Sequence, residues 1–65
     1  MTLEQIKAAV IAGNTVHWQN KGYIVQVDNA GQWYILFTPN NHYIGLTWQD
    51  GVTMNGKQEQ FYIGG

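Results

Sequence analysis

The 65-residue sequence contains no cysteine, no serine and no arginine. Without cysteine, the chain can form neither disulfides nor zinc sites with thiolate ligands. The lack of serine and cysteine also removes the nucleophiles of the commonest covalent mechanisms. A chain of this length forms one domain, spanning residues 1–65, with one small core. Packing or self-association must therefore stabilise it, because the usual covalent supports of small domains are missing.

Charged side chains are also scarce. Three lysines and four acidic residues give a net charge of −1, and in their place the chain has six asparagines and seven glutamines. Three scattered lysines cannot form the basic surface that dominates nucleic-acid affinity. A polar surface of low charge suits contact with protein better than contact with phosphate. We therefore expect a protein partner or a homodimer, and neither nucleic acid nor a small-molecule cofactor.

Few side chains remain that could carry catalysis or bind a metal. His17 and His42 have no third ligand at the spacing of a metal site. Three of the four acidic residues have structural explanations: Asp50 precedes a turn glycine, Glu4 lies in the first turn of a predicted helix, and Glu59 lies in a polar segment. We expect no enzyme, no catalytic residue and no bound metal.

The sequence predicts no targeting or membrane-spanning segment. The N-terminal stretch MTLEQIKAAVIAG has no basic region and carries Glu4 and Lys7 among its apolar residues, unlike a signal peptide. No apolar run approaches the roughly 20 residues that cross a bilayer. The expectation is a cytoplasmic protein that does not contact membranes.

The N-terminal segment has the pattern of an amphipathic helix over about residues 2–12. Thr2 and Gln5 have the spacing of a capping box. Apolar side chains recur at helical spacing along one side, and Gly13 is a typical residue after a helix end. The apolar positions are Leu3, Ile6 and Val10, flanked by Ala9 and Ile11.

After this helix, the apolar period changes from 3.6 to 2. Segments rich in β-branched and aromatic residues alternate with short turns that contain Gly or Asn. Such short turns connect antiparallel neighbours. We predict an α+β fold in which a short N-terminal helix packs on a four- or five-stranded antiparallel β-meander; the alternative is a helix plus a small, SH3-like, partly closed barrel. The predicted strands cover about residues 15–19, 23–28, 32–38 and 42–48, with 60–63 as a short fifth strand.

Alternation assigns the strand side chains to two faces, and both faces are apolar. The more apolar face is the one that we expect the helix to cover. A helix of about ten residues is only about 15 Å long, so it can cover one face and not two. The face assigned to the helix consists of Val16, Trp18, Tyr23, Val25, Val27, Trp33, Ile35, Phe37, Ile44, Leu46 and Trp48.

The second face must close into a barrel, be buried in a dimer, or bind a partner. Tyrosine suits the last two outcomes, because it combines apolar area with a hydroxyl and loses little rotamer entropy. Within this region a strand glycine, Gly45, indicates a bend, a bulge or a close approach of another backbone. The predicted partner-binding residues are Ile24, Tyr34, Leu36 and Tyr43, with His17 at their margin.

Two stretches, GNTVHWQNKGYIV (13–25) and NNHYIGLTWQDGVTMNGK (40–57), resemble short open reading frames of phage and prophage genomes. The products of those frames are uncharacterised small proteins with a helix followed by strands. The resemblance covers most of the chain and includes no motif of known chemistry. It implies an accessory protein that binds a host or defence protein.

The sequence therefore favours a non-catalytic protein-interaction domain that binds a partner, or itself, through the second sheet face. The alternative is binding of single-stranded nucleic acid by stacking of aromatic side chains on bases. Modules of that kind pair their aromatic residues with a basic groove, for which this chain has too few cationic side chains.

Overall fold

In the computed structural model, which describes residues 1–64, helix α1 spans Leu3–Ile11 and begins at the predicted capping box. The Gln5 backbone N–H donates to Thr2 Oγ1 at 3.2 Å, and the Thr2 N–H donates to Gln5 Oε1 at 2.9 Å. Gly13 follows the helix with a φ of 93°, a left-handed conformation that glycine adopts without strain. The predicted helix and both of its end signals are confirmed.

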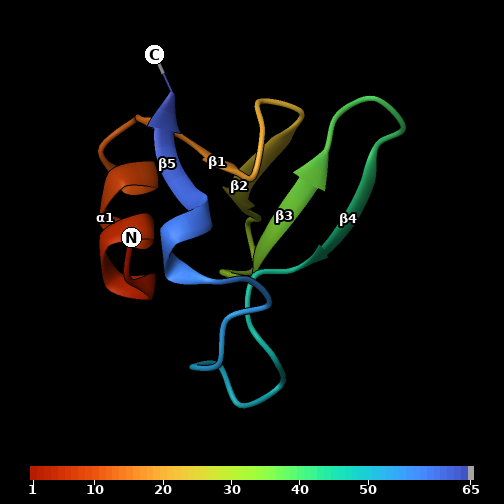
Figure 1. Cartoon of the computed structure of the whole chain (residues 1–65). Coiled ribbons are helices and arrows are strands. Elements are labelled where there is room, and N and C mark those ends of the chain that lie inside the picture. Colours follow the sequence, from red (N-terminus) through yellow and green to blue (C-terminus); the bar gives the residue numbers. More distant parts are fainter. Residues whose placement is uncertain (65) are drawn as a thin grey trace.

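Five antiparallel strands follow the helix, and they form two sheets (Figure 1). One sheet pairs β1 with β5, and the other is the meander β2–β3–β4. The predicted fold class, a helix on antiparallel strands, is confirmed, and the sheets do not join into a closed barrel. The strands are β1 (Thr15–Trp18), β2 (Tyr23–Val27), β3 (Trp33–Phe37), β4 (His42–Gly45) and β5 (Phe61–Gly64), and a 3₁₀ turn, η1 (Gln58–Gln60), precedes β5.

The place of β1 differs from the prediction of a meander that begins with it. β1 pairs with β5, in a register that runs from Thr15 opposite Gly64 to Trp18 opposite Phe61. In the tight turn after β1, the Asn20 N–H donates to the Trp18 carbonyl at 2.7 Å. This carbonyl is therefore already bonded, whereas a backbone ladder between β1 and β2 would need it as an acceptor. The C-terminal strand thus takes the position beside β1.

The core lies where α1 packs, mainly on β1 and β2. The predicted core face is correct for Val16, Val25, Ile35 and Leu46, which are almost fully buried, although Leu46 lies just after β4. It is wrong for three residues that are 38%, 46% and 63% exposed, Val27, Ile44 and Trp48. In Figure 1, β4 lies on the opposite side of the molecule from α1, which explains why its side chains are not covered. The buried apolar residues are Ile6, Ala9, Val16, Val25, Ile35, Leu46 and Phe61.

Two isoleucines of α1 provide a matched test of this packing. Ile6 is completely buried, whereas Ile11, which was predicted to flank the apolar side of the helix, is 76% exposed. Ile6→Ala should therefore lower the free energy of unfolding by about 2–5 kcal/mol. Ile11→Ala should change it by less than about 0.5 kcal/mol. Urea denaturation followed by circular dichroism measures both values, and equal losses would contradict the described docking of α1.

Candidate functional site

Four of the five predicted partner-binding residues lie together on the second face of the β2–β3–β4 sheet. Ile24 is opposite Leu36, and Leu36 is opposite Tyr43, so these three residues form a row across the three strands. Tyr34 lies on the same face, two residues from Leu36 along β3. We call the set of Ile24, Tyr34, Leu36 and Tyr43 the tyrosine face.

The two tyrosines of this face contact each other in a defined geometry. Their ring centroids are 5.5 Å apart, with an interplanar angle of 60°, which is typical of aromatic pairs in proteins. The Tyr34 hydroxyl also donates to Gln26 Oε1 at 3.0 Å. Tyr43 is 69% exposed, whereas Tyr34 and Leu36 are half-buried. Tyr34 is therefore held in place by Gln26 and by the Tyr43 ring, whereas Tyr43 is mostly exposed to solvent.

A surface groove of about 480 Å³ runs along the tyrosine face. Its one charged lining residue in the described part of the chain is Asp28. The Asp28 Oδ1 accepts hydrogen bonds from the Ala30 and Gln32 N–H groups, each at 2.9 Å, and so closes the turn between β2 and β3. The groove is lined by Asp28, Gln32, Trp33, Tyr34, Leu36, Tyr43 and Gly45.

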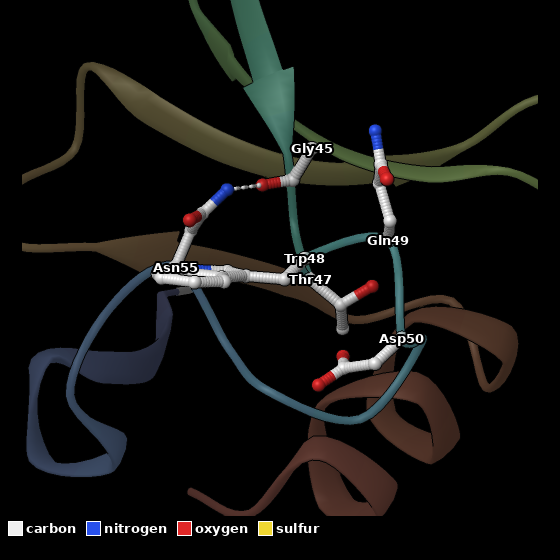
Figure 2. A pocket seen from close by; sticks show the side chains of 6 residues that line it. All are labelled: Gly45, Thr47, Trp48, Gln49, Asp50 and Asn55. Carbon is white, nitrogen blue, oxygen red and sulfur yellow. Dashed lines mark hydrogen bonds between the residues drawn. The ribbon is translucent and has the colours of Figure 1, made fainter.

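A second groove, of about 470 Å³, begins at Gly45, where β4 ends. From there, residues 46–57 form a loop that folds back so that Thr47 lies opposite Met54. The Asn55 side-chain amide donates to the Gly45 carbonyl at 2.7 Å, as Figure 2 shows. Because Gly45 lines both grooves, they meet at the end of β4. This groove is lined by Gly45, Thr47, Trp48, Gln49, Asp50 and Asn55.

Trp48 in this groove is a surface residue that the sequence pattern placed in the core. The predicted strand 42–48 ends at Gly45, so the alternation of faces does not extend to Trp48. Trp48 is 63% exposed, and its backbone N–H donates to the Thr53 carbonyl at 2.7 Å within the loop. The turn sequence Gln49–Gly51, directly after Trp48, is the one signal that could have indicated its position in a loop.

Asp50 holds the tip of this loop. The Thr53 hydroxyl donates to Asp50 Oδ2 at 2.6 Å, and the backbone N–H groups of Thr53 and Val52 donate to Oδ1 at 2.9 Å each. These hydrogen bonds, the one from the Thr53 hydroxyl above all, lower the pKa of the Asp50 carboxyl below its ordinary value of 3.8. The second groove therefore carries a negative charge at neutral pH.

His17, the fifth predicted residue, lies apart from the tyrosine face. It is only 8% exposed, and its ring packs against the Tyr62 ring at a centroid distance of 5.4 Å. The His17 Nδ1–H donates to the Tyr23 carbonyl at 2.9 Å, because a carbonyl can only accept. Gly64 lies against the ring, and a side chain there would collide with it. His17 therefore connects β1 to β2, which belong to different sheets and are not joined by a backbone ladder.

Neither a cluster of metal ligands nor a membrane-spanning helix occurs in the described part of the chain. Residues 1–64 contain no group of three or more His, Cys, Asp or Glu that could hold a metal ion. No helix among these residues is long and apolar enough to cross a membrane. No protein-family model, curated protein or solved structure matches the chain at a significant level. The candidate site therefore rests on its own geometry.

The lowered pKa of Asp50 predicts a pH dependence of stability. A carboxyl whose pKa is lower in the folded state stabilises the fold above its unfolded-state pKa, and this contribution is lost as the pH falls through the folded-state pKa. Asp50→Asn removes the charge at every pH. The variant should therefore be less stable than wild type at neutral pH, and the difference should shrink below about pH 4, near the unfolded-state pKa of Asp.

Urea denaturation of both proteins at neutral and acidic pH measures this difference, and NMR titration of the Asp50 carboxyl measures its pKa directly. A stability difference that is the same at both pH values would contradict the role assigned to the Asp50 charge.

Proposed function

We propose that the chain is a non-catalytic protein-interaction domain that binds a partner protein on the tyrosine face. The observation that carries this proposal is the exposure of Tyr43, at 69%, beside Tyr34 and Leu36 on the sheet face opposite the buried side chain of Ile35. Large aromatic side chains that expose apolar area next to a groove are the usual anchors of protein interfaces.

The tyrosine face is also ordered before any partner binds. Tyr34 is fixed by its hydrogen bond to Gln26 and by contact with the Tyr43 ring. A side chain that is already in place loses little conformational entropy on binding, and this favours affinity. A partner that fits would insert an apolar side chain between the tyrosines and offer polar groups to their hydroxyls.

The charges beside the tyrosine face favour a protein over a nucleic acid. Each groove has one charged lining residue among residues 1–64, and both are acidic, Asp28 and Asp50. Bases could stack on Tyr43 and Trp48, but their phosphates would come close to these carboxylates without the lysines that normally offset phosphate charge. A neutral or basic protein surface meets no such repulsion.

We also propose a biological setting for this domain, that of a phage or prophage accessory protein. The resemblance to phage and prophage reading frames points to an accessory protein that acts in the cytoplasm on a host or defence protein. A domain with few charged side chains and one exposed aromatic face suits such a role, because it needs a contact surface and no catalytic group.

Truncation of both tyrosines tests the proposal. Tyr34→Ala combined with Tyr43→Ala removes the two aromatic anchors and should weaken binding of the partner by at least about 30-fold, the loss expected for an interface hot spot of about 2 kcal/mol. The wild-type chain is used to capture the partner from a cell lysate, and the affinity of the purified partner for each variant is measured by calorimetry.

The matched control removes two exposed apolar side chains elsewhere. Ile11→Ala combined with Ile63→Ala truncates residues that are 76% and 52% exposed on α1 and β5. This control should bind the partner as the wild type does, and circular dichroism should show that both double variants remain folded. Equal affinity of the folded tyrosine variant and the control would remove the proposal.

A further inference from the structure

The outer strand of the three-stranded sheet, β4, has one edge that β3 does not pair, and hydrogen-bond alternation determines which backbone groups lie on it. The Leu46 N–H donates to the Trp33 carbonyl at 3.1 Å, one step beyond the end of β4 in the same register. Residues of an antiparallel strand point their backbone groups alternately toward and away from the neighbour. Ile44, like Leu46, therefore faces β3, and Tyr43 and Gly45 face outward.

The other edge of β3 confirms this assignment. There, the Asp28 N–H donates to the Gln32 carbonyl at 3.0 Å, and the Thr38 N–H donates to the Gly22 carbonyl at 2.8 Å. The even-numbered residues of β3 thus direct their backbone groups toward β2, and the odd-numbered residues direct theirs toward β4. The outward direction of the Tyr43 backbone follows from both ladders.

The two outward residues of β4 differ in what their carbonyls already bind. The Gly45 carbonyl accepts the hydrogen bond from Asn55 Nδ2 at 2.7 Å (Figure 2). Asn55 therefore occupies the edge at Gly45, where the N–H of an added strand would otherwise dock. Tyr43 is left to present a backbone donor and acceptor side by side, the pair that an added antiparallel strand requires.

At Tyr43, the edge of β4 also lacks the charged side chains, prolines and bulges that often prevent strands from pairing. Proteins protect such edges with charged side chains, particularly lysine, or with proline and bulges. No charged residue occurs between Asp28 and Asp50, and Pro39 lies in the turn before β4. Both sides of the strand carry exposed apolar side chains, since Tyr43 is 69% exposed and Ile44 is 46% exposed.

We propose that β4 pairs antiparallel with β4 of a second copy of the chain, about a two-fold axis at Tyr43. The Tyr43 N–H of each copy donates to the Tyr43 carbonyl of the other, and His42 lies opposite Ile44 of the second copy. The pairing joins two three-stranded sheets into one of six strands, with both tyrosine faces on the same side. It goes beyond the proposed function, because it uses the sheet edge and identifies the second copy as its occupant.

Two physical arguments favour this occupant and this register. A two-fold pairing must satisfy the same groups on both copies, and the Tyr43-centred register does so through the Tyr43 pair alone. The next pair in this register, Asn41 with Gly45, does not form, because Asn41 has a φ of 57° and is not extended, so the bond between Asn55 and Gly45 stays intact. A register centred on Ile44 would instead direct each Tyr43 N–H at a Gly45 carbonyl that Asn55 already binds. In addition, a domain of this size gains stability from association, because it buries little surface alone.

Single-cysteine variants test the register, because the chain has no cysteine of its own. In a directly opposed hydrogen-bonded pair, Cα atoms lie about 5.5 Å apart, within the range that a disulfide spans. Tyr43→Cys should therefore form a disulfide-linked dimer in a glutathione redox buffer. Tyr34→Cys is the matched control on the same face. The two copies of Tyr34 would be separated by three strand spacings across the sheet and by four residues along the strands, so their Cα atoms would lie about 20 Å apart and the variant should stay monomeric.

The association itself is tested by light scattering on the unmodified chain and on two further variants. The wild type should have the mass of a dimer at high concentration. Tyr43→Pro removes the outward N–H and should give a folded monomer, since this N–H is not used within the sheet. Tyr43→Ala keeps the N–H and should still dimerise.

Three results would overturn the pairing. The wild type could have the mass of one chain at every concentration, or folded Tyr43→Pro could form a dimer as stable as that of Tyr43→Ala. The third such result is equal cross-linking of Tyr34→Cys and Tyr43→Cys. The last result would mean that two tyrosine faces stack on each other. A monomeric wild type would still leave partner binding on the tyrosine face to be measured, so the two proposals fail separately.

Discussion

The reach of a single short helix is the constraint on which the rest of this structure depends. α1 has nine residues, which at about 1.5 Å per residue gives a length of about 14 Å. Through Ile6 and Ala9 it buries the side of the sheets formed mainly by β1 and β2. β3 still contributes Ile35 to this core, whereas β4 lies beyond the cover, on the opposite side of the molecule from α1. Ile44, on the core-facing side of β4, is exposed for this reason, and Tyr43 is exposed because it lies on the opposite face, where no helix packs.

The half of the molecule that α1 covers is held together by contacts between segments that are far apart in the chain. β5 pairs with β1, and the amino group of Met1 donates to the Gln58 carbonyl at 2.6 Å, so both ends of the described chain lie in this half. His17 completes it, because its ring takes the place of a backbone ladder between β1 and β2. The half of the molecule around α1 is thus held together by contacts between its N-terminal and C-terminal segments.

In the other half of the molecule, three surfaces meet at the end of β4. They are the tyrosine face, the outer edge of β4 and the loop of residues 46–57. Gly45 is the common point: it lines both grooves, and it lies opposite Tyr34 without a side chain that would cover that ring. The loop is held by Asp50 at its tip and by Asn55 at its base. Partner binding on the tyrosine face and strand pairing at Tyr43 would therefore use adjacent, rigidly connected surfaces and could occur together.

The sequence was sufficient for features that depend on neighbouring residues. The capping box of Thr2 and Gln5, the helix end at Gly13 and the spans of β1, β2 and β3 follow from local hydrogen bonds and from side-chain period, whereas the fourth strand ends three residues earlier than its pattern predicts. Alternation also placed Ile24, Tyr34, Leu36 and Tyr43 on one face, because side chains two apart on a strand, or opposite each other on paired strands, point the same way.

Features set by contacts between distant segments required the three-dimensional structure. The pairing of β1 with β5 joins residues from opposite ends of the chain, and neither strand carries a pattern that identifies its neighbour. The burial of His17 follows from that pairing, because its ring packs against Tyr62 of β5. The exposure of Ile44 and Trp48 depends on where α1 docks and where β4 ends. Side-chain period assigns a residue to a face, but only packing determines whether that face is covered.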